Sequence, residues 1–275
     1  MNNQEFPSLG NRPTRRAHSL QCVIGAVCLT LFSALASADE WDRVLPPGSV
    51  VDHKTIGEWT GDWWRKAIVA INFPFPIGGS QPGALGDLGG PVFFAVASPG
   101  PGATTYTYTI PREKFVLFPL YTYSWMSQTS ADPCSDLPCA RALSNGFVHA
   151  TTALSVTIDG QPVHDLFRHF EATPRLFYVP SIPVDGWWAG GDPTEAGLWF
   201  GFTSGYWLML KPMSPGEHVV RVSVTAAYAS VCADGSQDCV IPSPGAPQVS
   251  ATTLIITVPC DERDHGDRAC RRRND

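Results

Sequence analysis

The amino-acid sequence predicts a mainly β protein, an antiparallel β-sandwich or jelly roll with one or two short helices packed on it. The first reason is a series of about eight short segments that are apolar or alternate between apolar and polar residues. The second is the abundance of turn formers, with 25 glycines and 25 prolines. The third is a low charged fraction of 16%, against a usual value of about 25%. This composition favours an extracellular β protein over a helical bundle.

The strand candidates follow from period-two alternation, which places successive side chains on opposite faces of a sheet. Tyrosines alternate with threonines over residues 105–110, and valines alternate with polar residues over 220–225. The strand over 154–158 ends at Asp159-Gly160, a strong hairpin signal. The remaining strand candidates are residues 92–97, 115–121, 176–179, 198–202, 206–210 and 254–258. We interpret residues 201–205 as a hairpin turn, because Thr203 stands where a nucleophile elbow needs serine.

One helix is predicted near residues 55–71. Thr55 and Glu58 have the spacing of a capping box, which marks a helix start. Apolar residues then recur at helical spacing and form one stripe, before Pro74 and Pro76 end the helix. We expect this helix to pack on a β-sheet.

The first 38 residues have the features of a signal peptide. Arg12, Arg15 and Arg16 precede an apolar stretch over 20–35, and Ala36-Ser37-Ala38 offers a cleavage site. We therefore expect a signal peptide over 1–38, a single β-sandwich domain over 39–259 and a charged tail over 260–275. The protein is then secreted or periplasmic, with no membrane span after cleavage.

Six cysteines remain beyond the predicted signal peptide. They form three near-neighbour pairs: Cys134 with Cys139, Cys232 with Cys239, and Cys260 with Cys270. In an oxidising compartment such pairs persist as disulfides. Near-neighbour pairing is one of the 15 connectivities that six cysteines allow.

Two stretches resemble a family of uncharacterised secreted bacterial proteins. They are Glu58-Trp59 through Trp63-Trp64, and the run over 205–212 that leads into Ser214-Pro215-Gly216-Glu217-His218. The second stretch, together with residues 156–160, also resembles immunoglobulin-like modules, in which an Asp-Gly turn and a Pro-Gly-x-His turn frame a sandwich. This resemblance implies the fold class and no assigned chemistry.

No recognised catalytic motif occurs, so the first functional hypothesis is a binding or structural module for a carbohydrate or other extracellular ligand. Trp187 and Trp188 follow Asp185-Gly186 on an expected loop, where tryptophans form flat platforms for sugar rings. The alternative is that both pack in the core. A net charge of −6 argues against nucleic acid as a partner.

The second hypothesis is an exported enzyme, a hydrolase or a metal-dependent enzyme. If residues 163–171 form a short helix, Asp165 and His169 stand one turn apart, and a carboxylate that orients a histidine suits acid–base chemistry. His218 is a further catalytic candidate. The alternative for Asp165 and His169 is a solvated pair on a helix face.

No cofactor is required by the sequence, but two kinds of metal site remain open. His218 shares the parity of the inward valines and could bind a transition metal with His149 or His164, or simply hydrogen-bond a turn. Two aspartate groups could bind Ca²⁺ or be solvated loop charge. These groups are Asp132 with Asp136, and Asp261 with Asp264 and Asp267.

Overall fold

The computed structural model describes residues 43–69, 85, 89–96, 102–128, 136–186, 188–189, 191–226 and 248–260. The chain divides into two compact units, Met1–Asp39 and Glu40–Asp275, and every described residue belongs to the second. The predicted signal peptide therefore lies outside the described residues, as do the prolines expected to end the helix.

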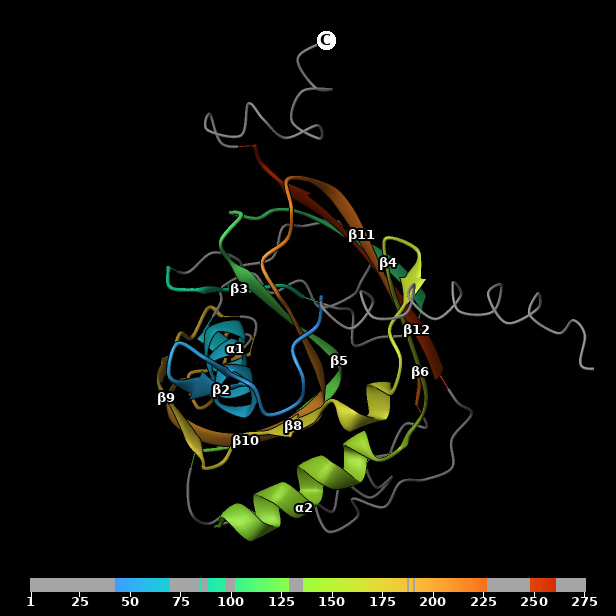
Figure 1. Ribbon diagram of the computed structural model, residues 1–275. Coiled ribbons are helices and arrows are strands. Elements are labelled where there is room, and N and C mark those ends of the chain that lie inside the picture. Colours follow the sequence, from blue (N-terminus) through green and yellow to red (C-terminus); the bar gives the residue numbers. More distant parts are fainter. Residues whose placement is uncertain are drawn as a thin grey trace, which may run out of the picture. The chain divides into compact units, whose positions relative to one another are not determined.

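Two five-stranded sheets form the body of the second unit (Figure 1). The first has the order β3 (Val92–Phe94), β5 (Phe115–Ser127), β10 (Gly197–Leu210) and β8 (Phe170–Ala172), and β9 (Phe177–Ile182) also pairs with β10. The second has the order β4 (Gly102–Thr109), β12 (Gln248–Val258), β11 (Gly216–Ala226), β6 (Thr151–Ile158) and β7 (Gln161–Pro162). A short ribbon joins β1 (Val50–Val51) to β2 (Lys54–Thr55). The predicted fold class is confirmed, although β3 with β5 and β4 with β12 are parallel pairs.

The core follows the alternation seen in the sequence. In β11 the buried residues are His218, Val220, Val222, Val224 and Ala226, each separated from the next by a more exposed one. Their partners in β12 include Leu254, opposite Val220. Because successive side chains point to opposite faces, this parity directs one face of the second sheet into the main apolar cluster.

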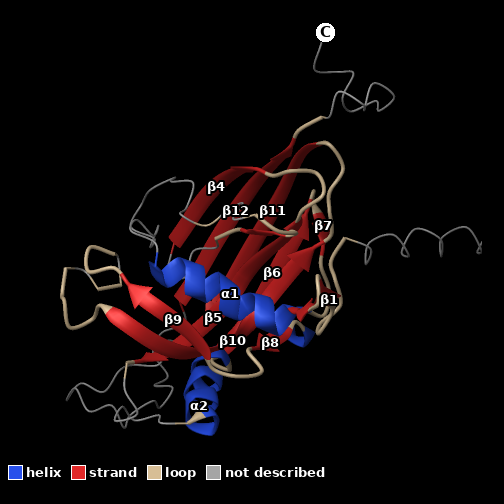
Figure 2. Ribbon diagram, turned by 90° about the vertical axis from the view of Figure 1, so that its left-hand side faces the viewer, coloured by secondary structure: helices blue, strands red, loops and turns tan. Residues whose placement is uncertain are grey.

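The predicted helix is present as α1 (Ile56–Val69) and lies across the first sheet (Figure 2). Its capping box forms as predicted: the Glu58 N–H donates to Thr55 Oγ1 at 3.2 Å, and the Thr55 N–H donates to Glu58 Oε2 at 2.9 Å. The described part of the stripe is buried (Ile56, Trp59, Trp63 and Ala67), and Trp63 joins α1 to the sheet core. Its indole N–H donates to the Ala95 carbonyl at 2.8 Å, and its ring lies edge-on to Trp207.

The prediction of a hairpin turn at residues 201–205 was wrong, because β10 runs unbroken through them. The two glycines there allow close packing instead of a turn. A Cβ at Gly205 would lie 2.6 Å from the Tyr121 carbonyl oxygen, and one at Gly201 would lie 2.3 Å from Met126 Sδ. Thr203 is buried in mid-strand, and its hydroxyl donates to the Tyr123 carbonyl.

Residues 163–171 do not form the short helix on which the one-turn spacing of Asp165 and His169 depended. Only Leu166–Arg168 form a single 3-10 turn, and β8 begins at Phe170. Asp165 has φ of 53°, a left-handed conformation that an α-helix does not contain. Val163, Leu166 and Phe170 all pack on the main apolar cluster without a continuous helix, whereas Phe167 is largely exposed.

A second helix, α2 (Leu137–Val148), was not predicted. It packs outside the first sheet, beside β5 and β10 (Figure 1). Its start signals were nevertheless in the sequence. Asp136 caps it by accepting from the Cys139 N–H at 2.9 Å, and Pro138 occupies the first turn, where proline is favoured.

Candidate functional site

The chain enters the fold through residues 43–48, which we call the strap; they end in a turn at Pro47 and Gly48. The strap is fastened to the end of β10 and the residue after it. The Leu45 N–H donates to the Met209 carbonyl at 2.8 Å, and the Lys211 N–H donates to the Arg43 carbonyl at 2.9 Å. Val44 forms an isolated antiparallel bridge with Leu210. Pro46 and Pro47 then stiffen the backbone, because each fixes its φ angle.

Two carboxylates hold the strap at its two ends. At the first end, Arg43 donates to Asp159 Oδ2 at 2.5 Å. At the other end, the Gly48 N–H donates to Glu171 Oε1 at 2.6 Å. Glu171 is buried, and this burial raises its pKa, although the Gly48 hydrogen bond opposes the change.

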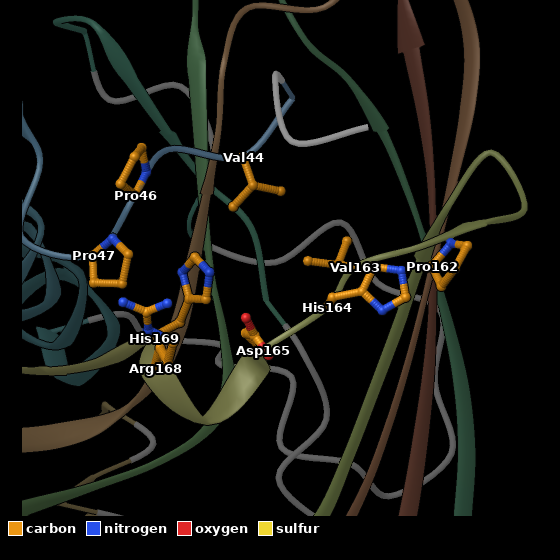
Figure 3. A pocket seen from close by; sticks show the side chains of 9 residues that line it. All are labelled: Val44, Pro46, Pro47, Pro162, Val163, His164, Asp165, Arg168 and His169. Carbon is orange, nitrogen blue, oxygen red and sulfur yellow. The ribbon is translucent and has the colours of Figure 1, made fainter. Parts of the chain in front are cut away.

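A pocket of about 210 Å³ lies between the strap and the segment that joins β7 to β8 (Figure 3). Its walls are largely apolar, with histidine and charged side chains on the side away from the strap. The lining residues are Val44, Pro46, Pro47, Pro162, Val163, His164, Asp165, Arg168 and His169. An apolar cavity of about 150 Å³ can hold benzene. This strap pocket is therefore large enough for one ring with a small substituent.

The turn at residues 165–169 brings three ionisable side chains to the strap pocket. Left-handed Asp165 reverses the chain, and the Arg168 N–H donates back to its carbonyl at 2.8 Å. The single 3-10 turn buries Leu166 in the core. It places Asp165, Arg168 and His169 along one wall, as Figure 3 shows.

His169 is the buried polar group of the pocket, with 5% of its surface exposed. Burial lowers the pKa of His169 most, the Arg168 charge lowers it further, and the Asp165 charge opposes both. The imidazole is therefore neutral at pH 7 and offers one donor and one acceptor. Within the described part of the chain, the side chains of Asp165, Arg168 and His169 make no hydrogen bond or ion pair.

The structure brings together three of the residues singled out in the sequence: His164, Asp165 and His169 all line the strap pocket. The strap, the opposite wall, could have been found only through its Pro46-Pro47 pair, which indicates a rigid extended segment. Sequence alone does not say what a rigid segment lies against.

His218 lies elsewhere, and both of its ring nitrogens are engaged. Nδ1 is 2.8 Å from Asp159 Oδ2, and Nε2 is 2.9 Å from the Ser214 carbonyl oxygen. This geometry joins the β6–β7 turn to the start of β11.

The histidines proposed as metal ligands are not grouped. His149 lies against the Phe170 ring at 5.5 Å, whereas His164 lines the strap pocket. In the part of the chain that the structure describes, no three His, Cys, Asp or Glu side chains lie close enough to hold a metal ion. Asp136 caps α2, and the other aspartates proposed for Ca²⁺, Asp132, Asp261, Asp264 and Asp267, lie outside the described residues.

Of the two tryptophans predicted to form a ligand platform, the structure describes Trp188, whereas Trp187 lies outside the described residues. Trp188 is half-buried, and its ring meets Trp199 edge-on at 5.7 Å. It packs against a small core formed by Ile68 of α1 with residues of β9 and β10. The observed ring therefore contacts protein on at least one side.

Two cysteines are described, Cys139 and Cys260, and both are disulfide-bonded. The cysteines to which they bond, and the predicted Cys232–Cys239 pair, lie outside the described residues. The near-neighbour pairing thus stays a prediction.

A wider hollow of about 710 Å³ lies between α1 and residues 173–180. Three of its charges already have partners, because Asp62 binds Lys54 at 2.6 Å and Arg65 at 3.0 Å, although Arg175 also lines it. Glu58 is occupied in the capping box. The strap pocket has three ionisable groups that are unpaired among the described residues, and it is therefore the better candidate site.

Comparison with known proteins assigns no family. No family model and no curated protein matches the chain. Among solved structures, a chain of "Structure of PbICP-C in complex with falcipain-2" matches with 10% identity and a TM-score of 0.22, over 62% of this chain and 99% of that chain. No helix among the described residues is long and apolar enough to cross a membrane. The geometry of the strap pocket is therefore the basis for the function proposed below.

Proposed function

We propose that this protein is an exported binding protein whose ligand site is the strap pocket. The observation that carries the proposal is His169, a buried imidazole that lines the pocket and has no hydrogen-bond partner among the described residues. The ring nitrogens of His169 are not among the fully buried polar atoms that lack a partner, so they are open to the pocket. A ligand in the pocket can therefore hydrogen-bond to the imidazole, which offers one donor and one acceptor.

The size of the strap pocket narrows the ligand class. A volume of about 210 Å³ is below the range of about 300–1,000 Å³ typical of drug-sized ligands. An oligosaccharide or a peptide therefore does not fit inside. Among the described residues, the lining also lacks phenylalanine, tyrosine and tryptophan, the residues that stack on sugar rings. Within the class of carbohydrate or other extracellular ligands, these features favour a small, mostly apolar molecule.

Export is supported by two independent features. The first 38 residues have the charged, apolar, A-x-A order of a signal peptide. Cys139 and Cys260 are disulfide-bonded, which is usual for proteins outside the cytoplasm. A secreted or periplasmic location is thus part of the proposal.

A pocket-filling variant tests the binding function. Val163 lines the strap pocket, so Val163→Phe places an extra ring in it; Val249→Phe adds the same ring on an exposed part of β12. Single-ring fragments, screened by ligand-detected NMR, should bind the wild type and Val249→Phe but not Val163→Phe. Circular dichroism checks that both variants are folded. Equal binding to all three proteins, or no binding to the wild type, would contradict the proposal.

An exported hydrolase or metal-dependent enzyme is the second candidate. It is favoured by one observation: the lowered pKa of His169, caused first by burial, keeps a potential general base neutral beside the Asp165 carboxylate. Hydrolysis of a small activated ester should then be lost in His169→Gln and kept in His149→Gln, because His149 does not line the pocket. Stoichiometric metal in the purified protein, lost in His164→Ala, would favour the metal-dependent form. Absence of both turnover and metal would leave binding as the function.

A further inference from the structure

We propose that the strap pocket takes a small zwitterion with an apolar body of about one ring, the chemical class of the hydrophobic α-amino acids. This inference rests on the proposed binding function and adds the ligand class. It assigns Arg168 to the carboxylate of the ligand, Asp165 to its ammonium group and the strap to its apolar part.

Among the described residues, the pocket is lined by one acidic side chain, Asp165, and one arginine, Arg168. Asp165 and Arg168 are three positions apart on the turn before β8, and both line the pocket. They form no ion pair with each other or with any other described residue. Both influence the buried His169 electrostatically, so both lie near it. Two opposite charges that do not neutralise one another can each receive one charged group of the same ligand.

A zwitterion satisfies both charges, and a ligand with one charge does not. A simple carboxylate would leave Asp165 beside a second negative group, and a simple amine would leave Arg168 beside a second positive one. The neutral imidazole of His169 adds one donor and one acceptor. Charge-assisted hydrogen bonds are stronger than neutral ones. A ligand with both a carboxylate and an ammonium group therefore gains binding free energy at Arg168 and at Asp165.

The opposite wall suits an apolar body. Val44, Pro46 and Pro47 of the strap face the charged turn across the pocket (Figure 3). The strap is held in place by Asp159 at one end and by Glu171 at the other. This wall is therefore preformed, which lowers the entropic cost of binding.

Isothermal titration calorimetry with four probes tests the ligand class. The probes share a phenyl ring: L-phenylalanine, 3-phenylpropionate, 2-phenylethylamine and N-acetyl-L-phenylalanine amide, which lacks both charges. L-phenylalanine should bind at least about tenfold more tightly than each of the others, since a hydrogen bond to a charged group contributes that much or more.

Two charge-removing variants should act on different probes. Arg168→Gln should weaken 3-phenylpropionate about tenfold and leave 2-phenylethylamine unchanged, whereas Asp165→Asn should do the reverse. L-phenylalanine should lose affinity in both variants. Arg221→Gln and Asp185→Asn, which alter exposed residues outside the pocket, should change none of these affinities.

The outcomes separate this inference from the binding function. If all four probes bind equally, and Val163→Phe abolishes their binding, the pocket binds small molecules but the zwitterion assignment is wrong. If one singly charged probe binds best, the ligand class has that single charge and the assignment is again wrong. If no probe binds and the fragment screen also finds nothing at the pocket, the proposed function itself fails.

Discussion

Asp159 joins three segments of the chain through one carboxylate. It accepts hydrogen bonds from Arg43 of the strap, from the His218 ring and from the Val219 N–H, the last at 2.9 Å. Burial opposes its ionisation, but the hydrogen bonds from His218, Val219 and Arg43 outweigh it and hold the pKa of Asp159 below its ordinary value. The Asp-Gly pair predicted a turn, and the turn also proved to be an anchoring point.

Asp159 should make the free energy of unfolding decrease at low pH. The unfolded chain protonates this carboxylate near pH 4, above its folded pKa. Its contribution to the free energy of unfolding is therefore complete above about pH 4 and is lost as the pH falls through the folded pKa. Urea unfolding followed from pH 6 to pH 3 should show less of this loss in Asp159→Asn than in the wild type. Asp185→Asn, at an exposed position, should behave as the wild type does; equal acid sensitivity in all three proteins would contradict the role of Asp159.

Glu171 should change the pH dependence of stability in the direction opposite to Asp159. Burial raises the pKa of Glu171, so the folded chain takes up this proton at a higher pH than the unfolded chain. Stability from Glu171 is thus lost as the pH rises through the folded pKa. Glu171→Gln removes the charge and keeps an acceptor for the Gly48 N–H, so it should resist denaturant better than the wild type at pH 7 and lose that advantage near pH 4. Exposed Glu217→Gln is the matched control, and a destabilised Glu171→Gln at pH 7 would mean that the charge itself stabilises the fold.

At the scale of elements, α1 approaches the first sheet closely through two glycines on one face. A Cβ at Gly57 would lie 2.3 Å from the Ala172 carbonyl oxygen, which belongs to the backbone of β8. A Cβ at Gly61 would lie 2.9 Å from Thr173 Cγ2, a side-chain atom. An added methyl group is therefore accommodated more easily at Gly61, where a side chain can move, than at Gly57, where backbone lies in the way.

Alanine substitutions at three helical glycines should separate packing from helix propensity. Gly57→Ala should destabilise the fold by about 1–3 kcal/mol, because the helix must shift away from β8. Gly146→Ala in α2, where a Cβ meets nothing within 4 Å, should stabilise it by up to about 1 kcal/mol. Gly61→Ala should fall between them. Free energies of unfolding from guanidinium titration check this order, and a stabilising Gly57→Ala would show that the close approach is not required.

A substitution at Trp188 shows whether this residue belongs to the small core around Ile68 and Trp199 or forms part of a ligand platform. Because its ring packs edge-on against Trp199, Trp188→Ala should lower the free energy of unfolding by about 2 kcal/mol. A platform residue would leave stability unchanged. Leu198→Ala, at a 57% exposed position nearby, serves as the control and should have little effect.

The sequence predicted those elements whose signals are local. The capping box located α1, and the alternation of valines located β11, because both patterns depend on neighbouring residues. The short helix considered over 163–171 does not form, because Asp165 is left-handed and only residues 166–168 make a helical turn before β8 begins. The turn predicted at residues 201–205 is absent because Gly201 and Gly205 allow β10 to pack closely against β5. Only the tertiary structure reveals this contact.

For the whole molecule, the two sheets and α1 position the strap, and the strap completes the pocket. His164, Asp165 and His169 could be identified from their chemistry, but their convergence on the strap could not be predicted from the sequence. The strap lies more than 100 residues away in sequence and is attached by backbone hydrogen bonds, which any residue can make. Long-range contacts of this kind leave no pattern in a single sequence.

The central claim is that the strap pocket is a ligand site, and a crystallographic fragment screen tests it most directly. Crystals of the protein, soaked individually with single-ring zwitterionic, acidic, basic and neutral fragments, should show fragments seated between Pro46, Pro47 and His169, with a hydrogen bond to the imidazole. The same soaks of Val163→Phe crystals should leave the pocket without fragments. Fragments that gather only elsewhere on the wild-type protein would contradict the account.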